Sequence, residues 1–193
     1  MNRFVKQILK EGRVLPGDVL KIDSFFNHQV DIKLMRWIGK EFYKRFKDAG
    51  VTKIMTLEAS GIPPAVMTAH YFGLPLVFVK KAKSSNLGNQ NLYRAKIKSY
   101  TYGFDYYATC VKDFISKDDK ILISVDFLAT GEAIFGMINI CKQAKAKVVG
   151  VGACVEKGFQ PGGKKIRKKG YHLESLAIIS KMDDDGYIEF VNK

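Results

Sequence analysis

Apolar runs that alternate with helix-like segments constrain the fold of this chain more than any other feature. The strand-like runs lie at 53–57, 75–81, 121–125 and 147–158. Between them, apolar residues recur at helical spacing, as in the long segment that Asp31 would cap and Gly50 would close. Strands that alternate with helices favour a mostly parallel central sheet covered by helices on both faces, so we expect an α/β fold.

One excursion interrupts this alternation between residues 82 and 114. It begins with the polar run "AKSSNLGNQN" at 82–91, whose composition predicts a mobile segment. The segments 93–102 and 105–114 alternate partially and are rich in Tyr and Thr, with Gly103 between them, which predicts a β-hairpin projecting from the body. The 193 residues contain no internal repeat and no linker, so we expect one domain.

The net charge of the chain is +13, and it rests on 26 lysines and only 6 arginines. Proteins that read bases depend on arginine forks, whereas a lysine excess attracts polyanions in general, including phosphorylated small molecules. A bias in genomic composition explains the excess equally well. The sequence has no RNP, KH or helix-turn-helix pattern, so nucleic acid is not expected as a partner.

Nothing in the sequence indicates a membrane or an oxidising compartment. No apolar run is long enough to cross a bilayer, and the N-terminal "MNRFVKQILKEGR" has no apolar signal core. Cys110, Cys141 and Cys154 are scattered and form no CxxC pair, which favours buried apolar residues over a disulfide framework or a zinc site. We therefore expect a cytoplasmic protein.

The stretch "KILISVDFLATGEA" at 120–133 carries the clearest candidate site. Its apolar run stops at Asp126, and small residues around Gly131 precede a helix-like pattern. Ligands of α/β proteins bind at the carboxyl ends of parallel strands, where a helix N-terminus presents N–H groups to an anion. The turn 129–133 is therefore interpreted as a phosphate cradle, to which Thr130 adds a hydroxyl donor. A plain strand–turn–helix connection stays open, because the stretch matches neither the Walker loop nor the GxGxxG fingerprint.

The segment "ILISVDFLATGEA" resembles the phosphoribosyl-diphosphate signature of the type I phosphoribosyltransferases. Together with "VLKIDSFFNHQVD", "KIMTLEASGIPPAVMTA", "VEKGFQPGG" and "GYHLESLA", it makes the chain similar to the bacterial xanthine phosphoribosyltransferases along nearly its whole length. This resemblance implies a cytoplasmic homodimer that acts in purine salvage. It would join xanthine to 5-phosphoribosyl-1-diphosphate and release xanthosine 5′-monophosphate and pyrophosphate. The resemblance also implies a single domain with a hood from about 1–35 plus the C-terminal segment, and a flexible lid at about 82–114.

The same resemblance assigns residues to the phosphorylated substrate. The 5′-phosphate would lie in the turn formed by Ala129, Thr130, Gly131, Glu132 and Ala133. Pyrophosphate would be held by Mg²⁺ and by the backbone of "EASG", where Ser60 and Gly61 stand and where Gly61 would allow close packing against the phosphates. Lys81 would reach the pyrophosphate, within one subunit or across a dimer interface, although "KKAK" is also typical of a solvated surface run. Asp126 would meet the ribose hydroxyls or a magnesium-bound water.

Leu20, Asn27 and Lys157 match the positions at which the family contacts the base. Xanthine offers two carbonyl oxygens and ionises readily, so Lys157 would supply a cation, Asn27 an amide donor, and Leu20 a ring-face or backbone contact. Related hypoxanthine–guanine enzymes carry a proton-accepting aspartate where Ala129 stands here, and a partly anionic base needs less help of that kind. Taken alone, Lys157 is more typical of a surface lysine, and Asn27 is more typical of a turn.

Two departures from the family pattern leave an alternative open. The family usually has two adjacent acids at the strand end, but Val125 replaces the first, so that only Asp126 remains. Glu132 places a carboxylate beside the expected phosphate, although the helix dipole favours a negative charge there. The alternative to an active enzyme is a non-catalytic regulator of the same fold that senses phosphoribosyl diphosphate or purines.

Overall fold

An eight-stranded sheet forms the centre of the molecule. The structure is a computed structural model that describes residues 1–82, 91–98 and 106–191. Within these residues the strand order is β10-β9-β8-β7-β3-β4-β6-β5. The strands are β3 (Lys53–Leu57), β4 (Leu76–Ala82), β5 (Leu92–Ile97), β6 (Tyr106–Val111), β7 (Lys120–Leu128), β8 (Lys147–Lys157), β9 (Leu173–Met182) and β10 (Ile188–Phe190). The pairs from β4 to β9 are parallel and both edges are antiparallel, so the mostly parallel sheet is confirmed.

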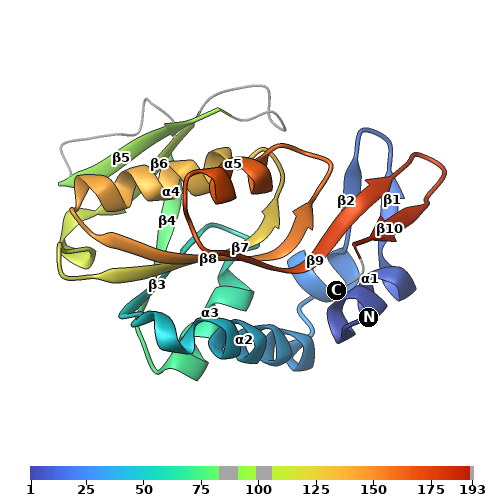
Figure 1. Ribbon diagram of the computed structural model, residues 1–193, viewed down its shortest axis with the longest axis horizontal. Helices are drawn as coiled ribbons and strands as arrows, with labels where there is room; N and C mark the ends of the chain where they lie inside the picture. The colour runs from blue at the N-terminus through green and yellow to red at the C-terminus, as the bar shows by residue number, and fades with distance from the viewer. Residues whose placement is uncertain (83–90, 99–105, 192–193) are drawn as a thin grey trace.

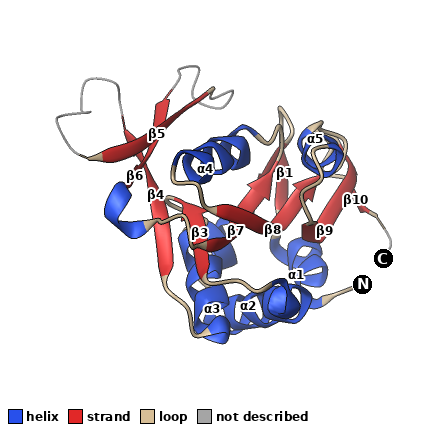
Figure 2. Cartoon of the chain, turned by 60° about the vertical axis from the view of Figure 1, so that its left-hand side comes forward, coloured by secondary structure: helices blue, strands red, loops and turns tan. Residues whose placement is uncertain are grey.

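Helices cover both faces of this sheet (Figure 1, Figure 2). One face carries α2 (Ile32–Phe46) and α3 (Ile62–Phe72), and the other carries α4 (Glu132–Gln143) and α5 (Gly162–Lys168). Burial of apolar side chains between these layers supplies the main driving force for folding. Two hydrophobic clusters result: the first contains Phe42 and extends to Leu20, and the second contains Ile134 and Val125.

Local sequence signals set the ends of the helices. The side chain of Asp31 accepts a hydrogen bond from Leu34 N at 3.0 Å, so Asp31 caps α2 as predicted. Helix α3 begins with prolines, which lack the N–H that the first turn leaves unpaired, and ends at Gly73, whose φ of 65° is left-handed. Gly50 closes the turn after α2 in the same conformation, with φ 66°.

The N-terminal residues form a small layer beside β9 and β10 (Figure 1). It consists of α1 (Arg3–Glu11) and a hairpin of β1 (Arg13–Leu15) and β2 (Val19–Lys21). Asn2 Nδ2 donates to Leu176 O at 2.6 Å and joins this layer to β9. After β2 the chain forms a wide helical turn at Asp23–Asn27.

The excursion contains the predicted hairpin, which is formed by β5 and β6. The hairpin does not simply project from the body, because β6 also pairs antiparallel with β4 at Lys80–Ala82 and so extends the sheet. Figure 2 shows this edge on the left of the molecule, with α4 beside it. Most of the polar run expected to be mobile, as well as Gly103, lies outside the described residues.

Helix α5 is not anticipated by the sequence. Two glycines open this seven-residue helix, and glycine is a poor helix former. A helix this short is marginal by itself and depends on tertiary packing. Here Ile166 is fully buried against the sheet, and Arg167 forms an ion pair with Glu156 of β8.

Candidate active site

A cavity of about 530 Å³ lies at the carboxyl ends of β3, β7 and β8. This is the place where α/β sheets bind ligands, because the connecting loops splay apart there. Its wall includes eight of the twelve residues singled out in the sequence: Ser60, Lys81, Asp126, Ala129, Thr130, Glu132, Ala133 and Lys157. Residues from four separate segments of the chain are thus brought together around one space.

A left-handed glycine shapes the turn that precedes α4. Gly131 has a φ of +88° and caps the helix, so it occupies a backbone region that favours glycine. A Cβ there would lie 3.3 Å from Gly162 Cα and 3.3 Å from the ring of Phe135. The first N–H groups of a helix have no partner within the helix, and at α4 they belong to the turn that lines the cavity.

Two carboxylates face the cavity from neighbouring strands. Asp126 lies near the end of β7, and its Oδ2 accepts a hydrogen bond from Ser60 Oγ in the turn after β3. Glu58 lies in the same turn, and its Oε1 accepts from Lys81 N at 2.5 Å. The backbone of β4 and the acidic turn are therefore joined at the mouth of the site.

Gly61 is buried and does not line the cavity. A Cβ at this position would lie 2.4 Å from Thr56 Oγ1 and 2.9 Å from Leu57 O. Glycine is therefore required here by packing within the protein, because the turn folds back on the end of β3 and leaves no room for a side chain. That reason is separate from the approach to phosphates expected from the sequence.

Lys157 ends β8 and lies half-buried in the cavity wall. Its Nζ donates to Asp18 O at 2.7 Å and lies 6.0 Å from the centroid of the Phe127 ring. Burial lowers the pKa of Lys157, because desolvation disfavours the charged ammonium, while the nearby charge of Asp18 acts in the opposite direction. The lysine thus holds the turn between β1 and β2 over the cavity.

Leu20 and Asn27 are not brought into the cavity with Lys157. The side chain of Leu20 is buried in the first hydrophobic cluster, whereas its neighbour Val19 lines the cavity. Asn27 is exposed at the end of its helical turn, and with its amide turned so that the nitrogen donates, that nitrogen lies 3.3 Å from Asp23 Oδ1 and 3.2 Å from Ile22 O. Of these three residues, the structure places only Lys157 at the site.

The hairpin contributes wall residues that the sequence does not single out. Ile97, Lys98 and Tyr106 line the cavity beside Lys81, whose Nζ lies 5.6 Å from the centroid of the Tyr106 ring. These residues reach the cavity because β6 pairs with β4, and sequence periodicity does not reveal that pairing. Gln160 lines the opposite side, in the turn before α5.

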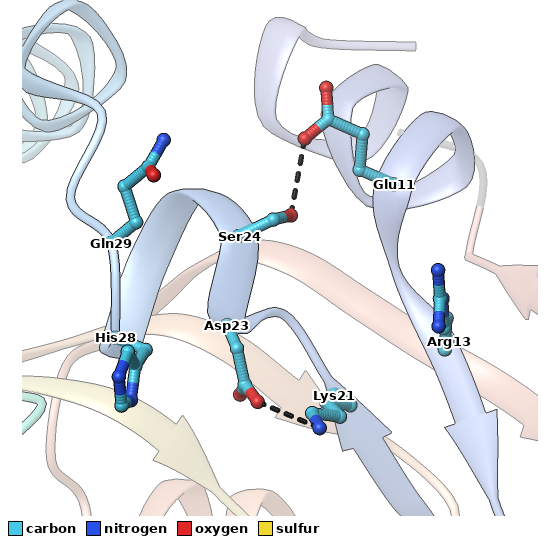
Figure 3. A pocket seen from close by; sticks show the side chains of 7 residues that line it. All are labelled: Glu11, Arg13, Lys21, Asp23, Ser24, His28 and Gln29. Carbon is cyan, nitrogen blue, oxygen red and sulfur yellow. Dashed lines mark hydrogen bonds and ion pairs between the residues drawn. The ribbon is translucent and has the colours of Figure 1, made fainter.

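A second cavity of about 470 Å³ lies between α1, β1 and the turn that follows β2 (Figure 3). It contains charges of both signs, because Lys21 and Asp23 form an ion pair at 3.1 Å and Ser24 Oγ donates to Glu11 Oε2 at 3.2 Å. Arg13 and His28 lie on opposite sides of the space in Figure 3. Because these charged side chains already pair with one another, the cavity is more typical of packing between the N-terminal elements than of a phosphate site.

The described residues contain no group of three or more His, Cys, Asp or Glu side chains placed to hold a metal ion by themselves. In the same part of the chain, no helix combines the length and the apolar character needed to cross a membrane.

Comparisons with known proteins agree with this architecture. A family model described as "Phosphoribosyl transferase domain" matches residues 23–182. The xanthine phosphoribosyltransferase of Oceanobacillus iheyensis is 49% identical over 190 residues, which cover 98% of this chain and 97% of that protein. The xanthine phosphoribosyltransferase of Clostridium novyi is 47% identical over 192 residues and the full length of both chains.

Solved structures of adenine phosphoribosyltransferases share the fold. The protein from Trypanosoma brucei has a TM-score of 0.75 at 18% identity, with coverage of 92% of this chain and 80% of that chain. The protein from Giardia lamblia has a TM-score of 0.74 at 17% identity, with coverage of 92% and 98%. At these identities the likeness extends to the fold alone.

Proposed function

This chain belongs to the phosphoribosyltransferase family, and we propose that it is a xanthine phosphoribosyltransferase of purine salvage. In this reaction the C1–O bond of 5-phosphoribosyl-1-diphosphate breaks and pyrophosphate leaves with the bonding electrons. A ring nitrogen of xanthine forms the new bond to C1 and loses its proton, which gives xanthosine 5′-monophosphate. The observation that carries the proposal is the single cavity that unites the turn 129–133, Asp126 and Lys157.

The 5′-phosphate is proposed to bind in the turn from Ala129 to Ala133. Its support is the left-handed Gly131 and the unpaired N–H groups at the start of α4, which favour a negative charge. Thr130 adds a hydroxyl from the cavity wall. Glu132 also lines the cavity, so its carboxylate would have to turn outward when the phosphate binds.

Asp126 is proposed to hold the ribose hydroxyls at the centre of the site. The hydrogen bond from Ser60 fixes the orientation of its carboxylate, and a negative charge near C1 stabilises the positive charge that develops on the ribose ring. Ser60 and Gly61 belong to the turn proposed to hold pyrophosphate, and Lys81 reaches the same mouth from β4. A leaving group held in place by these residues reacts from an ordered position.

Mg²⁺ is the proposed cofactor, carried with the phosphorylated substrate. Asp126 and Glu58 place carboxylate oxygens on the cavity wall, and magnesium commonly takes one or two carboxylates together with substrate phosphates. The donor set therefore fits. When bound, the ion would neutralise part of the charge on pyrophosphate.

Lys157 is proposed to recognise xanthine through a charge-assisted hydrogen bond. Its ammonium would exchange Asp18 O for a carbonyl oxygen of the base, and the half-buried position strengthens the attraction to a partly anionic ring. Leu20 would contribute its main chain, since its side chain is buried. Asn27 stays a proposed contact, and its amide would have to leave Asp23 and Ile22 to reach the base.

The excursion at 82–114 is proposed as a lid that excludes water during reaction. Its support is the hairpin, which already supplies Ile97, Lys98 and Tyr106 to the wall. The residues at about 1–35, with the C-terminal segment, are proposed as the hood over the base. A homodimer in the cytoplasm follows the family resemblance.

One assay tests the function. The protein is incubated with Mg²⁺, phosphoribosyl diphosphate and each of xanthine, guanine, hypoxanthine and adenine, and nucleotide formation is followed. Xanthosine 5′-monophosphate and pyrophosphate in equal amounts are expected. Val125 favours one alternative, a regulator that binds phosphoribosyl diphosphate or purines without turnover, and binding without product would identify it.

A further inference from the structure

An ion pair between the partly exposed Arg167 and the buried Glu156 lies outside the cavity wall and plays no part in the reaction described so far. Glu156 is 3% exposed, and Arg167 binds it as a fork, with Nη1–Oε1 at 2.7 Å and Nη2–Oε2 at 2.8 Å. Ser175 Oγ adds a third hydrogen bond, to Oε2 at 2.5 Å. A buried carboxylate is tolerated only when it is paired in this way, so the fork is a fixed part of the structure.

This ion pair holds α5 in place. Arg167 lies on α5 and Glu156 on β8, so the fork anchors a seven-residue helix that opens with two glycines. A Cβ on Gly163 would lie 2.0 Å from Glu156 Oε1 and 2.8 Å from Arg167 Nη1. A side chain at position 163 would therefore clash with both partners of the ion pair. Only glycine leaves room for the pair that anchors the helix.

The other end of α5 rests on the proposed phosphate turn. Gly162 N donates to Ala129 O at 3.0 Å. A Cβ on Gly162 would lie 2.3 Å from Ala129 O and 2.8 Å from Gly131 N. The two backbones are thus in direct contact, with no room for a side chain between them.

We propose that the Glu156–Arg167 ion pair positions the turn 129–133 by fixing α5 against it, and so sets the affinity of the site for the phosphorylated substrate. Both are positioning residues, because neither lines the cavity. The proposal rests on the proposed function for its kinetic part. Its structural part, the coupling of α5 to the turn, does not depend on any substrate.

Hydrogen exchange measured by mass spectrometry tests the structural part without substrate. Arg167→Met removes the fork but keeps much of the aliphatic stem, and Glu156→Gln removes the charge but keeps an acceptor for Ser175. Peptides that cover 129–135 should exchange faster in both variants, while peptides from α2 keep the wild-type rate. Lys168→Met is the matched control, since Lys168 is exposed on the same helix and makes no ion pair within the described residues. Unchanged exchange at 129–135 in both folded variants would overturn the proposal.

Steady-state kinetics test the part that concerns the substrate. In Arg167→Met the KM for phosphoribosyl diphosphate should rise about 10-fold, and the KM for xanthine should change less than about 2-fold. Arg167→Lys keeps the positive charge but cannot form the two-pronged contact, so its KM for phosphoribosyl diphosphate should lie between those of wild type and Arg167→Met. An equal rise in both KM values, or a lower melting temperature with no change in either, would mean that the pair is merely structural and would overturn the proposal. If wild-type protein makes no xanthosine 5′-monophosphate, the proposed function fails, and the exchange result still decides the coupling.

Discussion

Ser60 Oγ donates a hydrogen bond to Asp126 Oδ2 and so joins the turn after β3 to the end of β7. The two residues are 66 positions apart in the chain and meet because β3 and β7 are adjacent parallel strands. The hydroxyl orients the carboxylate toward the cavity that both residues line. Any role of Asp126 in binding the ribose therefore depends partly on Ser60.

We expect Asp126→Asn to lower kcat/KM roughly 100-fold, because it removes the negative charge near the developing oxocarbenium ion. Ser60→Ala should lower kcat/KM about 10-fold, since it removes one hydrogen bond to a charged group. The double variant should lose less than the product of the two effects, because both substitutions act on one carboxylate. Losses that multiply fully would show that Ser60 and Asp126 act independently.

Gly131→Ala should raise the KM for phosphoribosyl diphosphate and lower stability by about 1–2 kcal/mol. The reason is the φ of +88° together with the 3.3 Å approach of Gly162 Cα and of the Phe135 ring. Gly73→Ala is the matched control, because Gly73 has a φ of +65° and no atom within 4 Å of a built Cβ. The control should lose stability by a similar amount but keep the wild-type KM, as measured by thermal melts and initial rates.

Lys157→Met should raise the KM for xanthine about 10-fold or more and leave the KM for phosphoribosyl diphosphate nearly unchanged. Lys157→Arg should retain part of the affinity because it keeps a positive charge. A rise in the KM for phosphoribosyl diphosphate alone would place Lys157 at the other substrate.

The ratio of the xanthine KM values of Lys157→Met and wild type should depend on pH. Burial lowers the pKa of Lys157 below its ordinary 10.5, so the ammonium loses its proton at a lower pH than an exposed lysine does. The KM ratio should therefore be largest at neutral pH, where Lys157 is charged, and should fall towards unity as the pH rises through the lowered pKa of Lys157. Taking the ratio cancels the ionisation of xanthine itself, and a ratio that stays constant up to pH 10.5 would contradict the prediction.

Val125→Asp should raise kcat at saturating Mg²⁺, because it adds a second carboxylate next to Asp126 on the cavity wall. Val125 is only 4% exposed, so the new carboxylate should also lower stability by about 1–3 kcal/mol. Val125→Asn has a similar shape without the charge and is the control. An unchanged or lower kcat in Val125→Asp would show that one acid is sufficient in this chain.

The sequence predicts elements whose signals are local. Asp31 caps α2, Gly50 closes the turn after it, and the strand Lys53–Leu57 has the predicted bounds, because capping, left-handed glycines and apolar runs act within a few residues. The turn 129–133 also follows from its neighbours, since Gly131 stands between a strand and a helix.

What the sequence misses depends on contacts between distant residues. Helix α5 contacts distant elements through Arg167, which pairs with Glu156, and through the buried Ile166, whereas its glycines argue against a helix when read alone. The pairing of β6 with β4 is likewise non-local, so the wall residues of the hairpin have no signal of their own. Asn27 and Leu20 follow the family pattern in sequence, yet their side chains are already engaged within their own layer.

The two hydrophobic clusters lie on opposite faces of the sheet, and they support different halves of the cavity. The first contains Leu20 and packs the layer proposed to cover the base, whereas the second contains Val125 and Ile134 and packs the start of α4. Residues packed in separate cores change largely additively when they are substituted. We therefore expect substitutions in the first cluster to change the choice of purine more than the affinity for the sugar phosphate, and substitutions in the second cluster to do the reverse.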